Sequence, residues 1–144
     1  RHTAAVPAAA PLDSRRAGLS SSEILLAFPV DEDGHALAAR GEPLFAFLPV
    51  RCYGFAFLMQ ADFILVTSRE DVAFDSTWNI FLRDQLADVF VQALTEIFKP
   101  AGLPLAVEYY TYLHVADVHE PFFTPVVQGI FKSLWYTECV LTES

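Results

Sequence analysis

The segment TSRED, residues 67–71, carries an arginine at a point where the character of the chain changes abruptly. A long apolar stretch ends just before it, and a stretch with helical periodicity begins shortly after it. Ser68 and Asp71 have the spacing of a helix-capping pair, which would make Arg69 an exposed residue of a first helical turn. The alternative is that a loop holds the Arg69 guanidinium out to meet an anion.

A second segment has carboxylates in a pattern that suggests calcium. Residues 31–42, DEDGHALAARGE, place Asp31, Asp33 and Glu42 at the first, third and twelfth positions of a calcium loop. Such a loop needs glycine at its sixth position for a sharp turn, and Ala36 stands there. The flanking segments also have the pattern of strands rather than helices. We therefore expect a solvated acidic loop and no calcium site.

A third segment, HVADVHE at residues 114–120, gathers chemically suitable metal ligands, namely His114, Asp117, His119 and Glu120. The HExxH spacing is absent, and an extended segment would point alternate side chains to opposite faces. We expect histidines of the surface and of turns here, and no metal site.

No complete catalytic motif is present in the sequence. The GxSxG elbow, the Walker lysine loop and the GxGxxG fingerprint are all absent. Cys52 and Cys139 have no CxxC spacing and could form one disulfide or be two buried thiols. We expect buried thiols, because a chain with a large core needs no covalent staple. The chain is therefore not expected to catalyse a reaction on its own.

The composition excludes two classes of partner. The chain has 144 residues, 53% of them hydrophobic, and a net charge of −9. Nucleic acids and anionic lipids are bound through clusters of basic side chains, and no such cluster follows Cys52. No apolar run reaches the roughly 18 residues that a membrane span needs. We therefore expect one globular domain in a reducing, cytoplasmic compartment, with neither nucleic acid nor membrane as a partner.

The first part of the chain has the pattern of a linker followed by strands. Residues 1–22 are rich in Ala, Pro and Ser and are expected to be a flexible linker, so that the domain spans residues 23–144. Apolar runs at residues 24–28 and 43–50 predict two strands. Alternation of apolar and polar residues over 54–66 predicts a third, longer strand.

The second part of the chain is mainly helical in pattern. Apolar residues recur at helical spacing over 75–99, with Asp75 or Ser76 as the N-cap and an end at Pro100 and Gly102. A second helix is expected to start near Phe123, because Pro125 fits only a first turn. Residues 105–115 and the last seven residues have the pattern of strands. The order of elements predicts an α+β fold with a mixed or antiparallel sheet, a long amphipathic helix and a second C-terminal helix packed on one face.

Several of these segments resemble one family when they are taken in order. They are SEILLAFPV, FAFLPVR, YGFAFLMQADFIL, TSRED, the pair WN that opens the long helix, and the closing LTES. Together they resemble the region that follows the nucleotide-binding domain in the sacsin and No Vein group of histidine-kinase/heat-shock-protein-90-like (GHKL) ATPases. The resemblance covers residues 23–144 and extends, more distantly, to the middle domain of the ninety-kilodalton heat-shock chaperones.

The resemblance implies a role for Arg69. In the chaperones the arginine of a similar loop reaches the γ-phosphate of ATP in the preceding domain, so Arg69 is the candidate catalytic residue, and Ser68 and Glu70 are its candidate neighbours in cofactor binding. The asparagine-bearing helix, the DxGxG motif and the glycine-rich lid of GHKL proteins are absent from the chain. We therefore expect no cofactor in this chain, with ATP and Mg in an upstream nucleotide-binding domain of a parent protein.

Two further functions are compatible with the same pattern. The chain could be a structural or interaction module of a large assembly that docks onto other protein chains and has no ATPase role. It could also bind a small apolar ligand on its Phe-rich face, although packing against the long helix would use the same residues.

Overall fold

The structure is a computed structural model that describes residues 2–6, 13–37, 41–101 and 105–141. It contains one five-stranded sheet in the order β1-β2-β5-β3-β4. The strands are β1 (His2–Ala5), β2 (Ser21–Ala27), β3 (Pro43–Ala46), β4 (Leu48–Cys52) and β5 (Leu58–Ala61). β3 and β5 are parallel, and the other neighbours are antiparallel. The sheet is therefore mixed.

The first predicted strand is confirmed, and the second is two strands. β2 ends at Ala27, two residues before Pro29. The run at residues 43–50 folds back on itself, because Phe47 has a left-handed φ of 67° and joins β3 to β4 in a tight hairpin. A left-handed conformation is uncommon for a residue with a β-carbon, so an apolar pattern gives no sign of it.

The third strand is much shorter than the one predicted over residues 54–66. Only Leu58–Ala61 pairs in the sheet as β5. Beyond Ala61 the backbone leaves the sheet: the Trp78 indole N–H donates to the Asp62 carbonyl at 2.8 Å, the Asn79 side-chain amide bonds to Ile64, and the Ala73 N–H also donates to the Ile64 carbonyl at 2.9 Å. Backbone groups must be paired when buried, and here helix side chains and residues 71–73 pair with them in place of a strand of the sheet.

The long helix is confirmed, and it begins where predicted. α1 spans Thr77–Ala93, and the Ser76 hydroxyl caps it by accepting the Asn79 N–H. The helix continues through a π-helical turn, Leu94–Phe98, into α2, Lys99–Ala101. Pro100 thus lies inside the final turn. A proline ring clashes with the carbonyl four residues back in a regular α-helix, and the wider π turn before it relieves that clash.

The segment at residues 105–115 is helical, so its prediction as a strand was wrong. It forms α3, Leu105–Glu108, and a 3₁₀ helix, Tyr109–Leu113. A 3₁₀ turn at Pro121–Phe123 leads into α4, Thr124–Leu141. Pro125 lies in the first turn of α4, as predicted. The expected C-terminal strand is instead the end of α4 as far as Leu141, and its last three positions lie outside the described residues.

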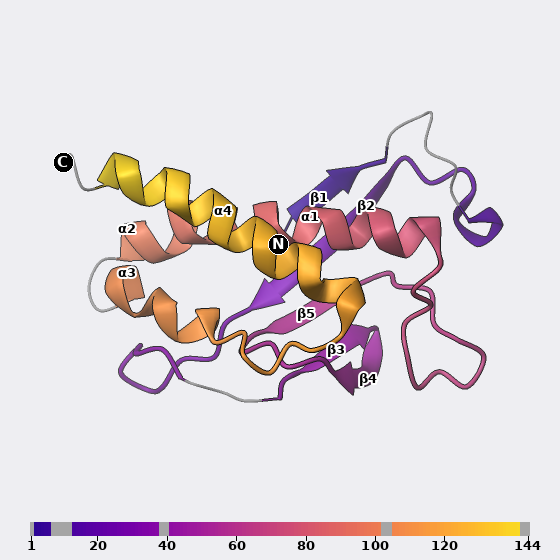
Figure 1. Ribbon diagram of the computed structural model, residues 1–144, viewed down its shortest axis with the longest axis horizontal. Coiled ribbons are helices and arrows are strands. Elements are labelled where there is room, and N and C mark those ends of the chain that lie inside the picture. Colours follow the sequence, from indigo (N-terminus) through magenta and orange to yellow (C-terminus); the bar gives the residue numbers. More distant parts are fainter. Residues whose placement is uncertain (1, 7–12, 38–40, 102–104, 142–144) are drawn as a thin grey trace.

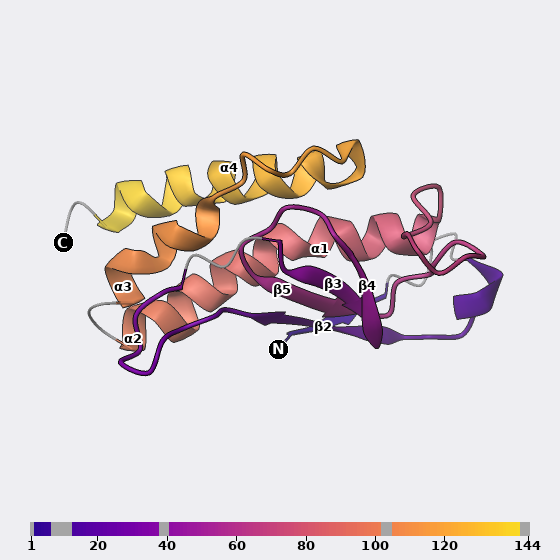
Figure 2. The ribbon, with the colours of Figure 1, turned by 90° about the horizontal axis from the view of Figure 1, so that it is seen from below.

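The elements form layers that Figures 1 and 2 show from two sides. In Figure 2 the sheet lies lowest, α1 crosses above it, and α4 lies above α1. α4 and α1 approach closely at Gly129, where an added β-carbon would lie 2.9 Å from the Ala87 β-carbon. The molecule is therefore an α+β fold in which both long helices cover the same face of the sheet, as the sequence predicted.

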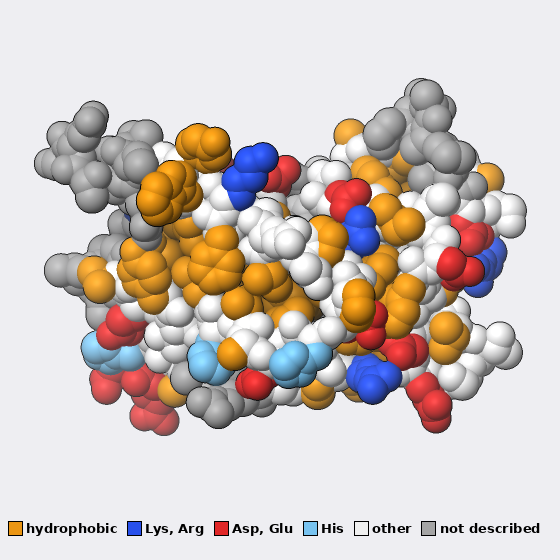
Figure 3. Space-filling view, viewed as in Figure 1, with side chains coloured by type: hydrophobic (Ala, Val, Ile, Leu, Met, Phe, Trp, Pro, Cys, Tyr) orange, Lys and Arg blue, Asp and Glu red, His pale blue; other side chains and the backbone are white. Residues whose placement is uncertain are grey.

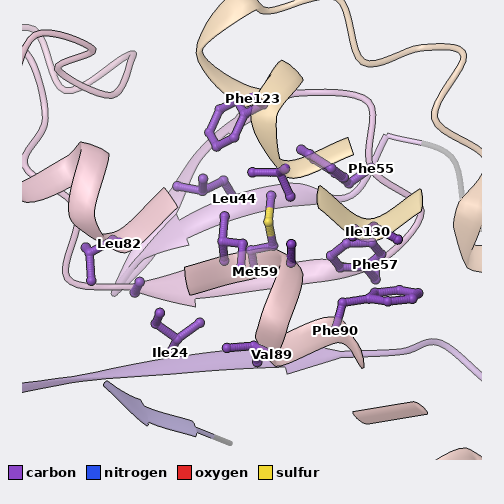
Figure 4. Close-up of a cluster of buried hydrophobic side chains, with 14 of the residues drawn as sticks. Ile24, Leu44, Phe55, Phe57, Met59, Leu82, Val89, Phe90, Phe123 and Ile130 are labelled. Carbon is purple, nitrogen blue, oxygen red and sulfur yellow. The ribbon is translucent and has the colours of Figure 1, made fainter. Parts of the chain in front are cut away.

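The core lies between the sheet and these two helices. Figure 4 shows its central side chains, which come from β2, β3, the 55–59 segment, α1 and the start of α4. The phenylalanines at positions 55, 57, 90, 98 and 123 are buried and contact one another or Phe28 in tilted and edge-to-face pairs. Such pairs contribute about 0.5–1.5 kcal/mol each beyond the area they bury. The Phe-rich face is thus packed against the helices.

Two expectations need correction. Part of the expected linker is a strand, because β1 pairs with β2 along its edge and buries Ala4, which is 3% exposed. Ser14–Arg16, in the same expected linker, form a 3₁₀ turn. The expectation of a buried thiol is wrong for Cys52, which is exposed on the edge strand β4 and donates to the Gly41 carbonyl. The Cys139 side chain lies outside those described.

Candidate functional site

The segment that carries Arg69 is a closed loop. The Val66 N–H donates to the Asp71 carbonyl at 3.0 Å, and the Arg69 N–H donates to the Val66 carbonyl at 2.9 Å. An isolated antiparallel bridge between Leu65 and Val72 joins the two ends. Arg69 has a φ of 62°, which is left-handed, and its side chain is exposed. The loop therefore has a defined shape, with Arg69 on its outer side.

The helix-capping interpretation of this loop was wrong. α1 is capped by Ser76, five positions beyond Asp71. The Ser68 hydroxyl accepts a long hydrogen bond, 3.5 Å, from the Glu70 N–H within the loop. Asp71 pairs with Arg51 at 2.9 Å and not with Arg69. Among the described residues, Arg69 makes no ion pair.

One side of the loop is anchored through Tyr53, the residue directly after β4. This side chain is buried, and its hydroxyl donates to the Asp71 carboxylate and accepts the Val72 N–H at 3.2 Å. Burial, followed by the hydrogen bond to Asp71, raises the pKa of Tyr53 above its ordinary value of 10. Tyr53 therefore stays neutral at physiological pH, and its hydroxyl remains a donor to Asp71.

The other side of the loop is anchored to α1. The Asn79 side chain is fully buried and bonds to Ile64 just before the loop and to Ala73 just after it. The neighbouring Trp78 holds Asp62. The residue pair WN at the start of α1 thus fixes the position of both ends of the Arg69 loop relative to the helix.

Arg69 lines a surface hollow of about 470 Å³, which we call the arginine hollow. Three arginines and one aspartate line it together with apolar and backbone groups; the lining residues are Arg15, Arg16, Ala46, Phe47, Leu48, Asp62, Phe63, Ile64, Leu65, Val66, Thr67 and Arg69. The chain has only nine basic residues in all, so a third of them face this one hollow. In a chain of net charge −9, three guanidinium groups thus lie close together at one place on the surface.

Arg15 and Arg16 come from a short 3₁₀ turn capped by Asp13. The Asp13 carboxylate accepts from the Arg15 side chain at 2.9 and 3.0 Å, and this pairing lowers the pKa of Asp13 to about 2. Arg16 donates to Asp62, the residue directly after β5, at 2.6 Å. Both arginines are therefore charged groups held in place by a carboxylate.

The hollow contains some of the residues that the sequence singled out and adds others. Arg69 lines it, whereas Ser68 and Glu70 are exposed on the same loop but do not line it. Arg15 and Arg16 were missed, because their segment has the composition of a linker and the contact with Asp62 spans 46 positions. The DSRR sequence, with an N-cap residue before two arginines, was the available signal.

The two segments considered for metal binding do not converge. Asp31 accepts the N–H groups of Asp33 and His35 at 3.0 and 2.8 Å in a local turn. Asp117 and His119 line a separate hollow of about 560 Å³ beside Cys52. Over the described part of the chain, no group of three or more His, Cys, Asp or Glu residues is placed to hold a metal ion. Likewise, none of the helices in that part is both long and apolar enough to cross a membrane.

Comparison with known proteins gives one informative similarity. No family model matches the chain, and no solved structure gives a significant match. The chain is similar to Protein NO VEIN of Arabidopsis thaliana, with 39% identity over 137 residues. The match covers 89% of this chain but only 5% of that protein, so the chain corresponds to a short segment of a far longer relative. The similarity supports a No Vein-like relationship.

Proposed function

We propose that this chain is a coupling segment of a GHKL-type ATPase, similar in role to a middle domain, and that Arg69 contacts the γ-phosphate of ATP held by a neighbouring nucleotide-binding domain. The observation that carries the proposal is the state of Arg69 itself: an exposed guanidinium on a closed loop, without an ion pair among the described residues. The resemblance of TSRED to the γ-phosphate loop and the similarity to Protein NO VEIN support it.

The chemistry suits that role. A guanidinium is planar and permanently charged, so it can donate two parallel hydrogen bonds to phosphate oxygens. It also offsets the charge that develops as the phosphoryl group is transferred, and in other enzymes an arginine supplied in this way increases the rate roughly 10³- to 10⁵-fold. Ser68 and Glu70 are the loop neighbours that would lie nearest the nucleotide.

The anchoring of the loop provides a route for coupling. Because Asn79 bonds to the backbone on both sides of the loop, a displacement of the loop by nucleotide moves the first turn of α1 with it. α1 in turn packs against α4 and the sheet. In this proposal ATP and Mg belong to the neighbouring domain, and this chain transmits its nucleotide state to chaperone-like or scaffold work.

The test is ATP turnover by the full-length gene product. Arg69→Ala should lower turnover at least tenfold and leave nucleotide affinity within about twofold, because the arginine acts mainly on the transition state. Lys132→Ala is the matched control, since it removes one positive charge from the exposed side of α4. Unchanged turnover in Arg69→Ala would refute the proposal.

A second function has its own supporting observation. α4 exposes three large apolar side chains, Phe131, Trp135 and Tyr136, with exposed fractions of 47%, 73% and 67%. Figure 3 shows hydrophobic side chains gathered on this face of the molecule. Exposed aromatic side chains are typical of protein interfaces. The alternative is therefore an interaction module that docks through α4 onto other protein chains and has no ATPase role.

The two functions predict opposite results. If the chain is only an interaction module, Trp135→Ala with Tyr136→Ala should reduce the mass of the assembly in light scattering, while Arg69→Ala changes neither assembly nor turnover. If the chain couples an ATPase, the Arg69 variant alone should lose turnover.

A further inference from the structure

Residues with unusual backbone conformations line the arginine hollow. Phe47 and Arg69 are the residues other than glycine with positive φ in the described part of the chain, at 67° and 62°, and both line the hollow. A left-handed conformation costs a residue with a β-carbon about 1–2 kcal/mol. Such conformations persist where the surroundings hold them, and they are concentrated at binding sites.

The surroundings do hold Phe47. Its N–H donates to the Gln60 side-chain oxygen at 3.0 Å, which fixes the tip of the β3–β4 hairpin against β5. The Phe47 ring is 75% exposed and Leu48 is 68% exposed. The hollow is therefore bordered by an apolar hairpin tip on one side and by the Arg69 loop on another.

Arg16 has an incomplete set of hydrogen bonds. One terminal nitrogen donates to Asp62 at 2.6 Å, and the other donates to the Arg15 carbonyl at 3.2 Å. Its Nε is buried and has no partner, the one such side-chain atom among the described residues. A buried donor without an acceptor costs about 1–3 kcal/mol, more when it is charged. An anion in the hollow that reached Nε would give this donor an acceptor and offset that cost.

We infer that the arginine hollow is a polyphosphate-binding site in which Arg16 and Arg69 are the two guanidinium ligands. Asp62 holds Arg16 at the wall of the hollow until an anion competes for it, and the Nε then donates to a phosphate oxygen. Two guanidinium groups from different segments can bind neighbouring phosphates or opposite sides of one. The inference rests on the proposed function, because it makes the γ-phosphate the anion that Arg16 and Arg69 share.

The charge balance favours a phosphate over a singly charged anion. Asp62 neutralises part of the positive charge of the hollow, and Asp13 neutralises Arg15 in a double hydrogen bond. A carboxylate ligand would have to displace Asp62 with no gain in charge, whereas a terminal phosphate carries more charge and more acceptor oxygens. The predicted ligand is therefore a chain of phosphates with a free end.

The test uses the 144-residue chain with sodium tripolyphosphate, ATP, ADP and citrate as probes. The Arg16 and Arg69 Nε–Hε signals in ¹H–¹⁵N spectra are identified by their loss in Arg16→Gln and Arg69→Gln. Both signals should shift together on titration with tripolyphosphate and with ATP, and less with ADP. Citrate that binds as tightly as tripolyphosphate would overturn the assignment to phosphate.

Variants distinguish a residue that binds the phosphate from one that only maintains the structure. In the 144-residue chain alone, where the neighbouring domain does not supply most of the affinity, Arg16→Gln and Arg69→Gln should each weaken tripolyphosphate binding at least fivefold. Lys132→Gln, which removes a positive charge elsewhere, should change it less than twofold. Arg16→Lys keeps the positive charge but loses the planar guanidinium, so its affinity for tripolyphosphate should lie between those of the wild type and Arg16→Gln. This variant replaces Arg16→Gln in the test if Arg16→Gln does not fold. Equal affinity in the wild-type, Arg16→Gln and Arg16→Lys chains would refute the role of Arg16.

The two proposals can fail separately. If tripolyphosphate does not bind the chain but Arg69→Ala still stops turnover in the full-length gene product, the shared site is wrong and the coupling role stands. If both arginines bind tripolyphosphate but Arg69→Ala leaves turnover unchanged, the site is supported and the ATPase coupling is wrong.

Discussion

Asn79 replaces a strand partner for Ile64. Its side-chain oxygen accepts the Ile64 N–H at 2.8 Å, and its side-chain nitrogen donates to the Ile64 carbonyl at 2.7 Å. The same nitrogen donates to the Ala73 carbonyl at 2.8 Å, on the far side of the Arg69 loop. One fully buried amide therefore bonds to the backbone at both ends of the loop from the first turn of α1.

Removing this amide should destabilise the protein strongly. Asn79→Ala leaves the buried Ile64 N–H without an acceptor, at a cost of about 1–3 kcal/mol, and removes one hydrogen bond each from the Ile64 and Ala73 carbonyls, which keep the N–H groups of Ala73 and Ser76. We expect the free energy of unfolding in urea to fall by about 3 kcal/mol. Asp88→Ala, at an exposed position of α1, should change it by less than about 0.5 kcal/mol. A loss below about 1 kcal/mol in Asn79→Ala would contradict this account.

Arg69 should be a residue that the fold does not need. Glycine adopts a left-handed φ without strain, so Arg69→Gly should raise the free energy of unfolding by about 0.5 kcal/mol, the relieved strain being partly offset by the greater freedom of the unfolded chain. Glu70→Gly is the matched control on the same loop; because Glu70 has no positive φ, that variant should lose about 0.5–1 kcal/mol. Urea unfolding of both variants measures the difference, and an Arg69→Gly chain less stable than Glu70→Gly would contradict it.

The contact between the 31–37 segment and α3 should depend on pH. His35 Nδ1 lies 2.8 Å from Glu108 Oε1, and the Ala36 N–H donates to Glu108 Oε2 at 2.8 Å. The hydrogen bond to Glu108 raises the pKa of His35 above 6.5, and the hydrogen bond from His35 lowers the pKa of Glu108 below 4.5. The two groups therefore attract most strongly when both are charged.

The direction of each pKa shift defines the pH range in which the His35–Glu108 pair stabilises the fold. The contribution of His35 is complete below pH 6.5 and is lost as pH rises through its folded pKa; that of Glu108 is complete above pH 4.5 and is lost as pH falls through its folded pKa. The melting temperature of the wild type should exceed that of His35→Gln most between these values. His114→Gln should keep the wild-type profile. A constant difference between wild type and His35→Gln from pH 4 to pH 8.5 would rule out the pairing.

The parts of the fold that depend on local pattern could be predicted. Ser76 as the N-cap, the apolar face of α1 and Pro125 in the first turn of α4 each follow from side chains close in sequence. The helical segment at residues 105–113 could not, because a short run of apolar and aromatic residues fits a strand or a buried helix equally well. The hairpin at Phe47 was also missed, since its turn contains no glycine or asparagine.

Only part of the candidate site could be predicted from the sequence, for a similar reason. Arg69 draws attention because it interrupts an apolar pattern. Arg16 does not, because its position depends on Asp62, which is distant in sequence, and on a turn inside a segment whose Ala-, Pro- and Ser-rich composition resembles a linker. Residues brought together only by the tertiary structure leave no periodic signal in the sequence.

The edge strand β1 has a consequence for attempts to isolate the domain. Composition marks residue 23 as its natural beginning, but a chain trimmed there would lose β1 and leave β2 as the open edge of the sheet. An uncovered strand presents a row of free backbone donors and acceptors that can pair with a second molecule. The first residues therefore replace an open edge of seven residues, β2, with one of four residues, β1, and a shorter edge strand gives a second molecule less to pair with.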